Sequence, residues 1–369
     1  MPEKTKLLLW VRSGGRCEFD GCNEYLFRHH VTLEAVNLGE LAHIVAFSPE
    51  GPRGKDGERP EQINDPSNLL LLCPRCHTLI DDESAGKKYS RSALQRYKKE
   101  HEDRIFRLTA AKPERKTTVL QLLAKVGGQS VAIPEANIWD AVAPMYPDER
   151  DCVINLTNLD DQSDAYYAVA VQEINRAVES LYRPGLQMEA PRHLSVFALA
   201  AMPLLMHLGR CLSNKVPADL YQRHRDTQDW AWKEAGPDVR YASHQIRKGT
   251  DEDRVALLLS LTDEVGLTDL PANIDNSYNV YEITLEGQSP SAYFLRRRVD
   301  LDGFRRAYQA VLAEIVRDHR TAKAVDVFPI VPAPIAVLCG FELFPKISPA
   351  LRVHDRDRRR GGWSYILTI

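Results

Sequence analysis

The sequence predicts an α+β module at the N-terminal end, followed by an α/β domain of two similar units. Three features lead to this fold class: a strand–loop–strand–helix pattern with polar residues at its junctions, two pairs of cysteines, and an internal repeat in the second half. The 369 residues are enough for two or three domains. With 44% hydrophobic and 27% charged residues, the composition is that of an ordinary soluble protein.

The strand–loop–strand–helix pattern lies between residues 39 and 82. An apolar strand ends at His43, and Asn68 directly precedes a second apolar strand of four leucines. A Cys-x-x-Cys-His sequence that ends at His77 falls where a helix is expected to begin. Farther along, residues 92–109 carry apolar side chains at helical spacing and would close this module.

These residue types suit phosphodiester cleavage. That reaction needs a deprotonated water, and a cation that stabilises charge on the phosphate and the leaving oxygen. His43 suits the role of general base, because the unperturbed pKa of histidine lies near neutrality. His77 suits a metal ligand, since imidazole binds metals and a helix N-terminus also favours phosphate.

The four cysteines have a separate interpretation. Cys17 and Cys22 form one spaced pair, and Cys73 and Cys76 form the other, as in two halves of a tetrahedral, all-cysteine zinc site. Two disulfides are the alternative, but nothing in the sequence suggests export to an oxidising compartment. A structural zinc ion would stabilise a module whose loop contributes few residues to the hydrophobic core.

That loop, residues 47–65, contains several glycines and prolines, with Arg53, Lys55 and Arg59 between them. Two interpretations stay open. The loop is either a solvated charged segment or a contact with the DNA backbone beside the active site.

The residues from 39 to 82 resemble the HNH nucleases, which carry a ββα-metal fold. The resemblance covers about the first 110 residues. It implies a metal-dependent endonuclease that cleaves double-stranded DNA with Mg²⁺ or a similar divalent ion. In this family Asn68 would either orient His43 or fix the loop between strand and helix.

One position departs from the family pattern. HNH nucleases usually have an acidic metal ligand immediately before the general base, and here that position is Ala42. Glu40 lies on the same strand face as Ala42, and Asp81 lies on the same helix face as His77. Either carboxylate could supply the missing ligand.

The domain boundaries follow from a change along the chain to alternating strand-like and helical segments. We expect a nuclease domain at residues 1–110, a linker at 111–134 and a second domain at 135–369. In the second domain, residues 255–261 read as a buried strand, and residues 165–181 and 301–317 read as helices.

Neither part of the chain is strongly basic. Residues 1–116 contain 20 Lys and Arg against 18 Asp and Glu, and the remainder contains 28 against 33. Affinity for DNA grows with the number of phosphates that a protein neutralises. Binding by one copy is therefore expected to be weak unless several copies assemble.

The second half contains an internal repeat. Residues 194–232 align with residues 325–363 at a fixed offset of 131, without a gap, and ten of 39 positions are identical. Each copy reads as a strand, a helix that begins near Pro203 or Pro334, and a further strand. Strand–helix–strand units with short loops imply parallel sheets, so two pseudo-symmetric Rossmann-like units are expected.

This half resembles a SAVED domain, a sensor of two CARF-like units that binds cyclic oligonucleotides. The resemblance rests on residues 197–209 with 328–340, on residues 220–232 and on residues 281–285, and covers residues 135–369. An HNH domain joined to a SAVED domain resembles the effector nuclease of CBASS anti-phage systems. It implies a cyclic di- or trinucleotide activator and a homo-oligomer that changes when the activator binds.

Parallel sheets bind ligands at the carboxyl ends of their strands. Here the corresponding loops are residues 158–162, 199–202, 262–264 and 330–333. Tryptophans could stack on bases and arginines could meet phosphates. Alternatively, the repeated tryptophans belong to the core and the arginines form solvated pairs with aspartates. The predicted ligand contacts are Arg225, Trp232, Lys233, Thr262, Pro332, Arg356 and Trp363, together with the run Arg358–Arg360.

Three functions are therefore weighed. The first is a ligand-gated nuclease, and the second is a restriction-type HNH endonuclease whose C-terminal domain recognises DNA. The third is a sensor whose HNH module retains only its zinc, which Ala42 motivates. Cys152, Cys211 and Cys339 are expected to be buried free thiols. A reducing cytoplasm without membrane attachment is the expected location.

Overall fold

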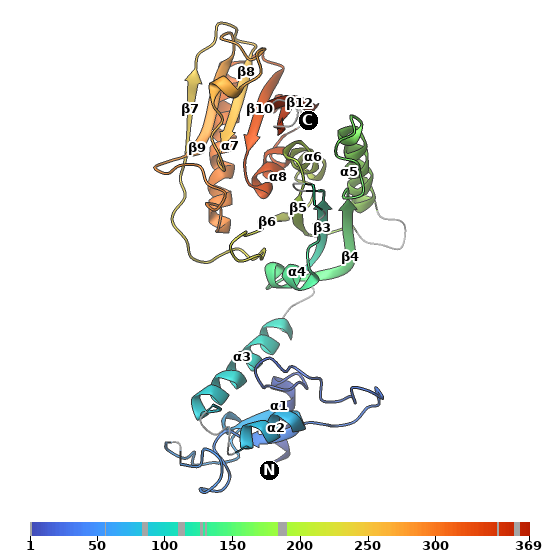
Figure 1. The fold of residues 1–369 in the computed structure, drawn as a ribbon, viewed down its shortest axis with the longest axis vertical. Coiled ribbons are helices and arrows are strands. Elements are labelled where there is room, and N and C mark those ends of the chain that lie inside the picture. The colour runs from blue at the N-terminus through green and yellow to red at the C-terminus, as the bar shows by residue number, and fades with distance from the viewer. Residues whose placement is uncertain are drawn as a thin grey trace. The chain divides into compact units, whose positions relative to one another are not determined.

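The computed structural model of the chain divides into two compact units, residues 1–112 and 113–369, and each is described by itself (Figure 1). The side chains of residues 149, 150 and 357 are left out of the description. The structure describes residues 2–55, 57–82, 88–109, 115–125, 128–129, 131–183, 190–344, 347–357 and 362–369.

The first unit has the expected order of strand, loop, strand and helix. Its elements are α1 (Glu3–Arg12), β1 (Glu40–His43), the 3-10 turn η1 (Pro66–Asn68), β2 (Leu69–Leu72), α2 (Pro74–Asp81) and α3 (Arg91–Thr109). Strands β1 and β2 pair antiparallel, with His43 opposite Leu69. The four leucines of β2 are all buried, which explains why this strand reads as a continuous apolar run. Pro74 occupies the first turn of α2, where its missing N–H costs nothing.

The second unit contains two sheets. The four-stranded sheet is parallel throughout, in the order β4-β3-β5-β6. The six-stranded sheet has the order β12-β11-β10-β8-β9-β7, with antiparallel pairing only at its two edge strands. The strands are β3 (Lys116–Leu123), β4 (Tyr146–Asn155), β5 (Leu194–Leu199), β6 (Ala218–Tyr221), β7 (Tyr241–Arg247), β8 (Val255–Ser260), β9 (Asn279–Leu285), β10 (Ala324–Ile330), β11 (Ala350–Asp357) and β12 (Gly362–Thr368).

The prediction of a linker at residues 111–134 is wrong for much of that range. Residues 116–123 form β3, which lies between β4 and β5 in the four-stranded sheet. Seven of its eight residues are buried. A buried run of this kind is typical of a central parallel strand, which packs on both faces. Residues 111–114, 126, 127 and 130 lie outside the described part of the chain.

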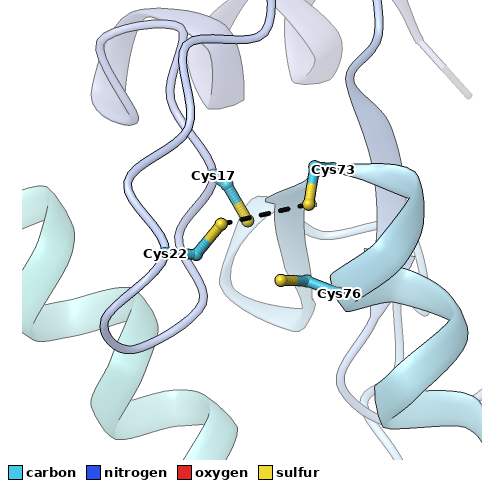
Figure 2. A group of neighbouring side chains, drawn as sticks. All are labelled: Cys17, Cys22, Cys73 and Cys76. Carbon is cyan, nitrogen blue, oxygen red and sulfur yellow. Dashed lines mark hydrogen bonds between the residues drawn. The ribbon is translucent and has the colours of Figure 1, made fainter. Parts of the chain in front are cut away.

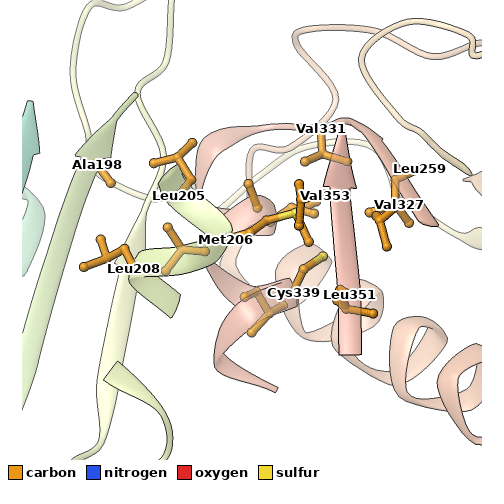
Figure 3. Close-up of a cluster of buried hydrophobic side chains, with 14 of the residues drawn as sticks. Ala198, Leu205, Met206, Leu208, Leu259, Val327, Val331, Cys339, Leu351 and Val353 are labelled. Carbon is orange, nitrogen blue, oxygen red and sulfur yellow. The ribbon is translucent and has the colours of Figure 1, made fainter. Parts of the chain in front are cut away.

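Helices α6 and α8 lie between the two sheets, and side chains from both sheets meet around them (Figure 3). Alternate residues of β5 and β10, such as Val196 and Val327, face this shared core. The intervening residues, such as Phe197 and Phe328, face smaller clusters on the opposite side of each sheet. The helices are α4 (Glu135–Val142), α5 (Tyr166–Tyr182), α6 (Met202–Leu212), α7 (Arg298–Asp318) and α8 (Ala333–Phe341).

Two repeat-matched glycines allow α6 and α8 to approach closely. A Cβ atom on Gly209 would lie 1.9 Å from the carbonyl oxygen of Val337, and one on Gly340 would lie 1.8 Å from that of Met206. The contact is reciprocal, because each helix places its glycine against the backbone of the other. These positions therefore require glycine for close packing.

The strand register corrects the gapless alignment of the repeat. Phe197 of β5 pairs with Tyr221 of β6, a separation of 24 residues, because 221 − 197 = 24. Val325 of β10 pairs with Leu351 of β11, a separation of 26, because 351 − 325 = 26. The second copy is therefore two residues longer between its strands. A shift of two leaves each side chain on its original face, which is why the apolar pattern did not reveal it.

Candidate active site and sensor site

The four predicted zinc ligands come together in the first unit (Figure 2). Their sulfur atoms all lie within 4.8 Å of one another, and the Sγ atoms of Cys22 and Cys73 are 4.0 Å apart. A tetrahedral zinc ion with bonds of about 2.3 Å would hold its sulfurs about 3.8 Å apart. All four cysteines are free, and 4.0 Å is far longer than a disulfide bond. The cluster therefore fits a closed metal site and not the disulfide alternative.

Burial alone does not favour thiolates in this cluster. It raises the pKa of Cys17 to about 12 and raises that of Cys76 further. Burial also raises the pKa of Cys22, but hydrogen bonds from the backbone at Glu24 and from the neighbouring thiols lower it more, so the net shift is downward. A divalent cation would displace the remaining protons, and its binding energy would add to the stability of the fold.

His43 lies at the end of β1, with its ring partly buried. Its Nε2 atom is 3.0 Å from Oδ1 of Asn64. When Nε2–H donates to this oxygen, Nδ1 is the nitrogen that can accept a proton. Asn64 is a residue that the sequence analysis missed, because a single polar residue in a polar loop carries no distinguishing signal.

Asn68 holds the loop between β1 and β2 through its side-chain hydrogen bonds. Its buried side chain accepts a hydrogen bond from the backbone N–H of Val45 at 2.9 Å. It also donates to the carbonyl oxygens of Val45 at 3.1 Å and Ile63 at 2.9 Å. Through these bonds Asn68 joins the segment after His43 to the segment that carries Asn64.

His77 lies between the two carboxylates that were proposed as alternative ligands. Its Nδ1 atom is 2.7 Å from Glu40, and its Nε2 atom is 3.4 Å from Asp81. The pKa of His77 is raised, mainly by the hydrogen bond to Asp81. The contact with Glu40 also raises this pKa, whereas burial lowers it. The carboxylates approach opposite ring nitrogens, so an ion bound by one nitrogen of His77 can share only one of them.

Arg53 is not exposed, which makes the expected contact with DNA wrong for this side chain. Only 8% of Arg53 is accessible. Its guanidinium donates to the carbonyl oxygens of Ile44 at 2.7 Å and Ile80 at 2.5 Å, and to Asp81 at 2.9 Å. Arg53 therefore ties the loop to the strand end and to α2.

The other two basic residues of the loop are more accessible. Lys55 is exposed and pairs with Glu50 at 2.9 Å. Arg59 is half-buried and donates to the carbonyl oxygen of Phe47 at 2.8 Å.

In the second unit, the predicted ligand contacts fall into two groups. Thr262 and Pro332 follow β8 and β10 at their carboxyl ends, and Arg356 approaches Asp263 at 3.4 Å. Arg356 is also the register partner of Trp363. These four residues therefore gather at one end of the six-stranded sheet.

The second group lies after β6. Arg225 is exposed, Trp232 packs partly against the core, and Lys233 binds both carboxylate oxygens of Asp229 at 2.7 Å. Within the described ranges, no hydrogen bond or ion pair joins this group to the first. The predicted run 358–360 lies outside the described residues.

The aromatic contacts change the assignment of the repeated tryptophans. The ring of Trp363 packs edge-on against Phe328 at 5.2 Å, and that of Trp230 packs in the same way against Phe197 at 5.4 Å. Trp230, and not Trp232, is therefore the counterpart of Trp363 in the first copy. Trp363 packs against the buried cluster that contains Phe328, and Trp232 is not its repeat partner.

A buried polar network next to Trp363 escaped the sequence analysis. Asp326 accepts hydrogen bonds from His354 at 2.8 Å and from Arg352 at 2.5 Å. Among the described residues, His354 Nδ1, Arg352 Nε and Trp363 Nε1 are buried without a partner. The available signals were one aspartate in the otherwise apolar strand β10 and alternating polar residues in β11.

Comparison with protein families matches residues 174–369 to SAVED, the "SMODS-associated and fused to various effectors sensor domain". The chain belongs to the SAVED family. Residues 17–85 match a family described as HNH endonuclease. The chain is thus an HNH nuclease domain joined to a SAVED sensor domain. A comparison with curated proteins found no match.

Among solved structures, the chain is similar to SAVED/CARF-domain receptors called Cap4. An Acinetobacter baumannii receptor with the cyclic trinucleotide 2'3'3'-cAAA has a TM-score of 0.47 at 11% identity, over 83% of this chain and 64% of that one. The same receptor with 3'3'3'-cAAA has a TM-score of 0.46 at 10% identity, over 75% and 62%. A Moraxella osloensis receptor has a TM-score of 0.44 at 8% identity, over 78% and 59%.

The match covers less than two thirds of the length of each of these receptors. Among the residues that the structure describes, no helix is long and apolar enough to cross a membrane.

Proposed function

We propose that the chain is a cyclic-oligonucleotide-activated, metal-dependent endonuclease that cuts double-stranded DNA in bacterial anti-phage defence. The observation that carries this proposal is the joining, in one chain, of an HNH domain and a SAVED sensor domain. The contacts of His43 with Asn64 and of His77 with Glu40 support a base and a metal ligand pair in the HNH domain.

In the nuclease domain, His43 takes a proton from the attacking water, and Asn64 holds the imidazole ring in position. His77 and Glu40 would hold Mg²⁺ or a similar ion, which supplies positive charge to the phosphate and the leaving oxygen. We favour Glu40 over Asp81, because Asp81 already accepts a hydrogen bond from buried Arg53. Cys17, Cys22, Cys73 and Cys76 would hold one structural zinc ion, and Lys55 and Arg59 would contact the DNA backbone.

In the sensor domain, the two strand–helix–strand units would act as related half-sites for one cyclic di- or trinucleotide. The reciprocal approach of Gly209 to the backbone of α8 and of Gly340 to the backbone of α6 supports this pseudo-symmetry. Ligand binding would change the oligomeric state, because a ligand gates an enzyme only through different affinities for two states. Assembly would also bring together several nearly neutral HNH domains, which singly bind DNA weakly.

The test is incubation of purified full-length protein with plasmid DNA and Mg²⁺, with and without a panel of cyclic di- and trinucleotides. We expect cleavage only with an activating nucleotide, together with a change in mass by light scattering. Cleavage that needs no nucleotide and prefers one DNA sequence would favour the restriction-type alternative. Nucleotide binding without any cleavage would favour a sensor with a spent HNH domain.

A further inference from the structure

A cysteine, a histidine and an asparagine converge on one point where α5 packs against α6. The Nε2 atom of His207 is 2.8 Å from Oδ1 of Asn175 and 3.3 Å from Sγ of Cys211. The third side of the triangle, from Cys211 Sγ to Asn175 Oδ1, is 3.1 Å. The three atoms thus contact one another in pairs, although their residues come from two helices.

The helices hold these side chains in place. On α5, Ile174 and Val178 on the neighbouring face are buried in the shared core. On α6, Met206, Leu208 and Leu212 are also buried there. The hydroxyl of Tyr182 donates to the carbonyl oxygen of Leu212 at 3.0 Å and so fixes the C-terminal end of α5 against α6. The convergence of the three donor atoms is therefore built into a packed helix pair.

The arrangement does not suit a nucleophilic relay of cysteine, histidine and asparagine. In such a relay the imidazole ring contacts the nucleophile through one nitrogen and the orienting group through the other. Here His207 contacts both partners through Nε2. Burial also raises the pKa of Cys211 to about 11, so the thiol is a poor nucleophile at neutral pH.

Three donors around one point suit a metal ion instead. We propose that Asn175, His207 and Cys211 form a second metal site, for a thiophilic divalent cation of the zinc class. Tetrahedral coordination would place such donors about 3.3–3.6 Å apart, from bonds of about 2.0–2.3 Å. The observed triangle needs to open by only a few tenths of an ångström. This site is separate from the four-cysteine cluster and does not depend on the proposed nuclease activity.

The surroundings leave room for a fourth ligand. A cavity of about 260 Å³ adjoins the site and is lined by Asn175 and Cys211, and also by Glu179, one helical turn after Asn175. Cys211 is free but only half-buried, whereas the sequence analysis expected a buried free thiol. An ion held by three protein donors with an open position would bind reversibly, in contrast to an ion in a closed four-cysteine site. It would also link α5 to α6.

The experiment uses full-length protein that already contains zinc in its four-cysteine site, titrated with Co²⁺ and followed by absorption spectroscopy. We expect a thiolate-to-cobalt charge-transfer band that saturates at one bound equivalent, to which the proposed His77–Glu40 site, having no thiolate, does not contribute. Cys211→Ala and His207→Ala should each lose the band, whereas Cys152→Ala, a matched change at another half-buried thiol, should keep it. Asn175→Asp should tighten binding about tenfold or more, because it puts a carboxylate in place of an amide oxygen.

Three outcomes would overturn the proposal. The first is the absence of any charge-transfer band at millimolar Co²⁺. The second is a band that survives Cys211→Ala, and the third is an affinity that Asn175→Asp leaves unchanged, because either of these would place the ion elsewhere. Circular dichroism of each variant should match that of the unmodified protein, and a second Cys211 variant, Cys211→Ser, keeps the test valid if Cys211→Ala does not fold.

Discussion

Replacing Gly340 with alanine tests the close contact between α6 and α8. The new Cβ would lie 1.8 Å from the carbonyl oxygen of Met206, and such contacts are not found below 3.0 Å. The helices must therefore separate locally by about 1.2 Å, because 3.0 − 1.8 = 1.2. Overpacking of a core costs about 1–3 kcal/mol, and here backbone meets side chain, so we take the upper end. Alanine returns about 1 kcal/mol through its higher helix propensity.

The net loss is then about 2 kcal/mol, and for a domain of this size 1 kcal/mol corresponds to about 2–4 °C. We expect Gly340→Ala to lower the calorimetric transition of the second unit by about 4–8 °C. Gly303→Ala is the matched control, since it lies in α7 and its Cβ would meet a ring of Tyr241 at an ordinary 3.4 Å. That variant should be neutral or slightly stabilising. If both variants shifted the transition equally, the argument from close approach would be wrong.

Three further predictions concern the proposed sites. His43→Ala should lower DNA cleavage by about 10²–10⁴-fold at unchanged zinc content, measured by plasmid cleavage and metal analysis, and near-full activity would remove His43 from the mechanism. Cys73→Ala should lose the zinc and unfold much of the first unit, measured by metal analysis and circular dichroism. Active protein that contains no zinc would contradict the proposed structural role of this ion. The pKa of His77 is raised in the folded chain by its contacts with Asp81 and Glu40. The stability that these contacts contribute is complete below the ordinary histidine pKa of about 6.5, and it is lost as the pH rises through the pKa of the folded state. Because Mg²⁺ competes with that proton, we expect Mg²⁺ affinity in a calorimetric titration to increase with pH over this window, and a pH-independent affinity would exclude His77 as a ligand.

Much of the nuclease domain could be predicted from residue order, because its two strands and α2 follow one another between Glu40 and Asp81, and each pair of cysteines is closely spaced. Arg53 and Asn64 could not. Arg53 sits in a loop rich in glycine and proline, where composition suggests exposure, yet it is buried by contacts with segments nine and 27 residues away. Asn64 contacts His43 across 21 residues. Neither contact follows from local spacing, because both depend on how the loop folds back on the strand.

The repeat shows which identities between two copies carry structural information. Phe197 and Phe328 occupy matching places at the offset of 131, and so do the two glycines of the helix contact. After the helices the structural offset is 133: Tyr221 stacks on Phe197 as His354 stacks on Phe328, and Trp230 corresponds to Trp363. The identity of Trp232 with Trp363 therefore marks no shared position. A backbone that must touch another backbone permits only glycine, whereas a strand can slip by two residues and keep its apolar face. For this reason the glycines report the true alignment of the two copies, and the identical residues of the following strands do not.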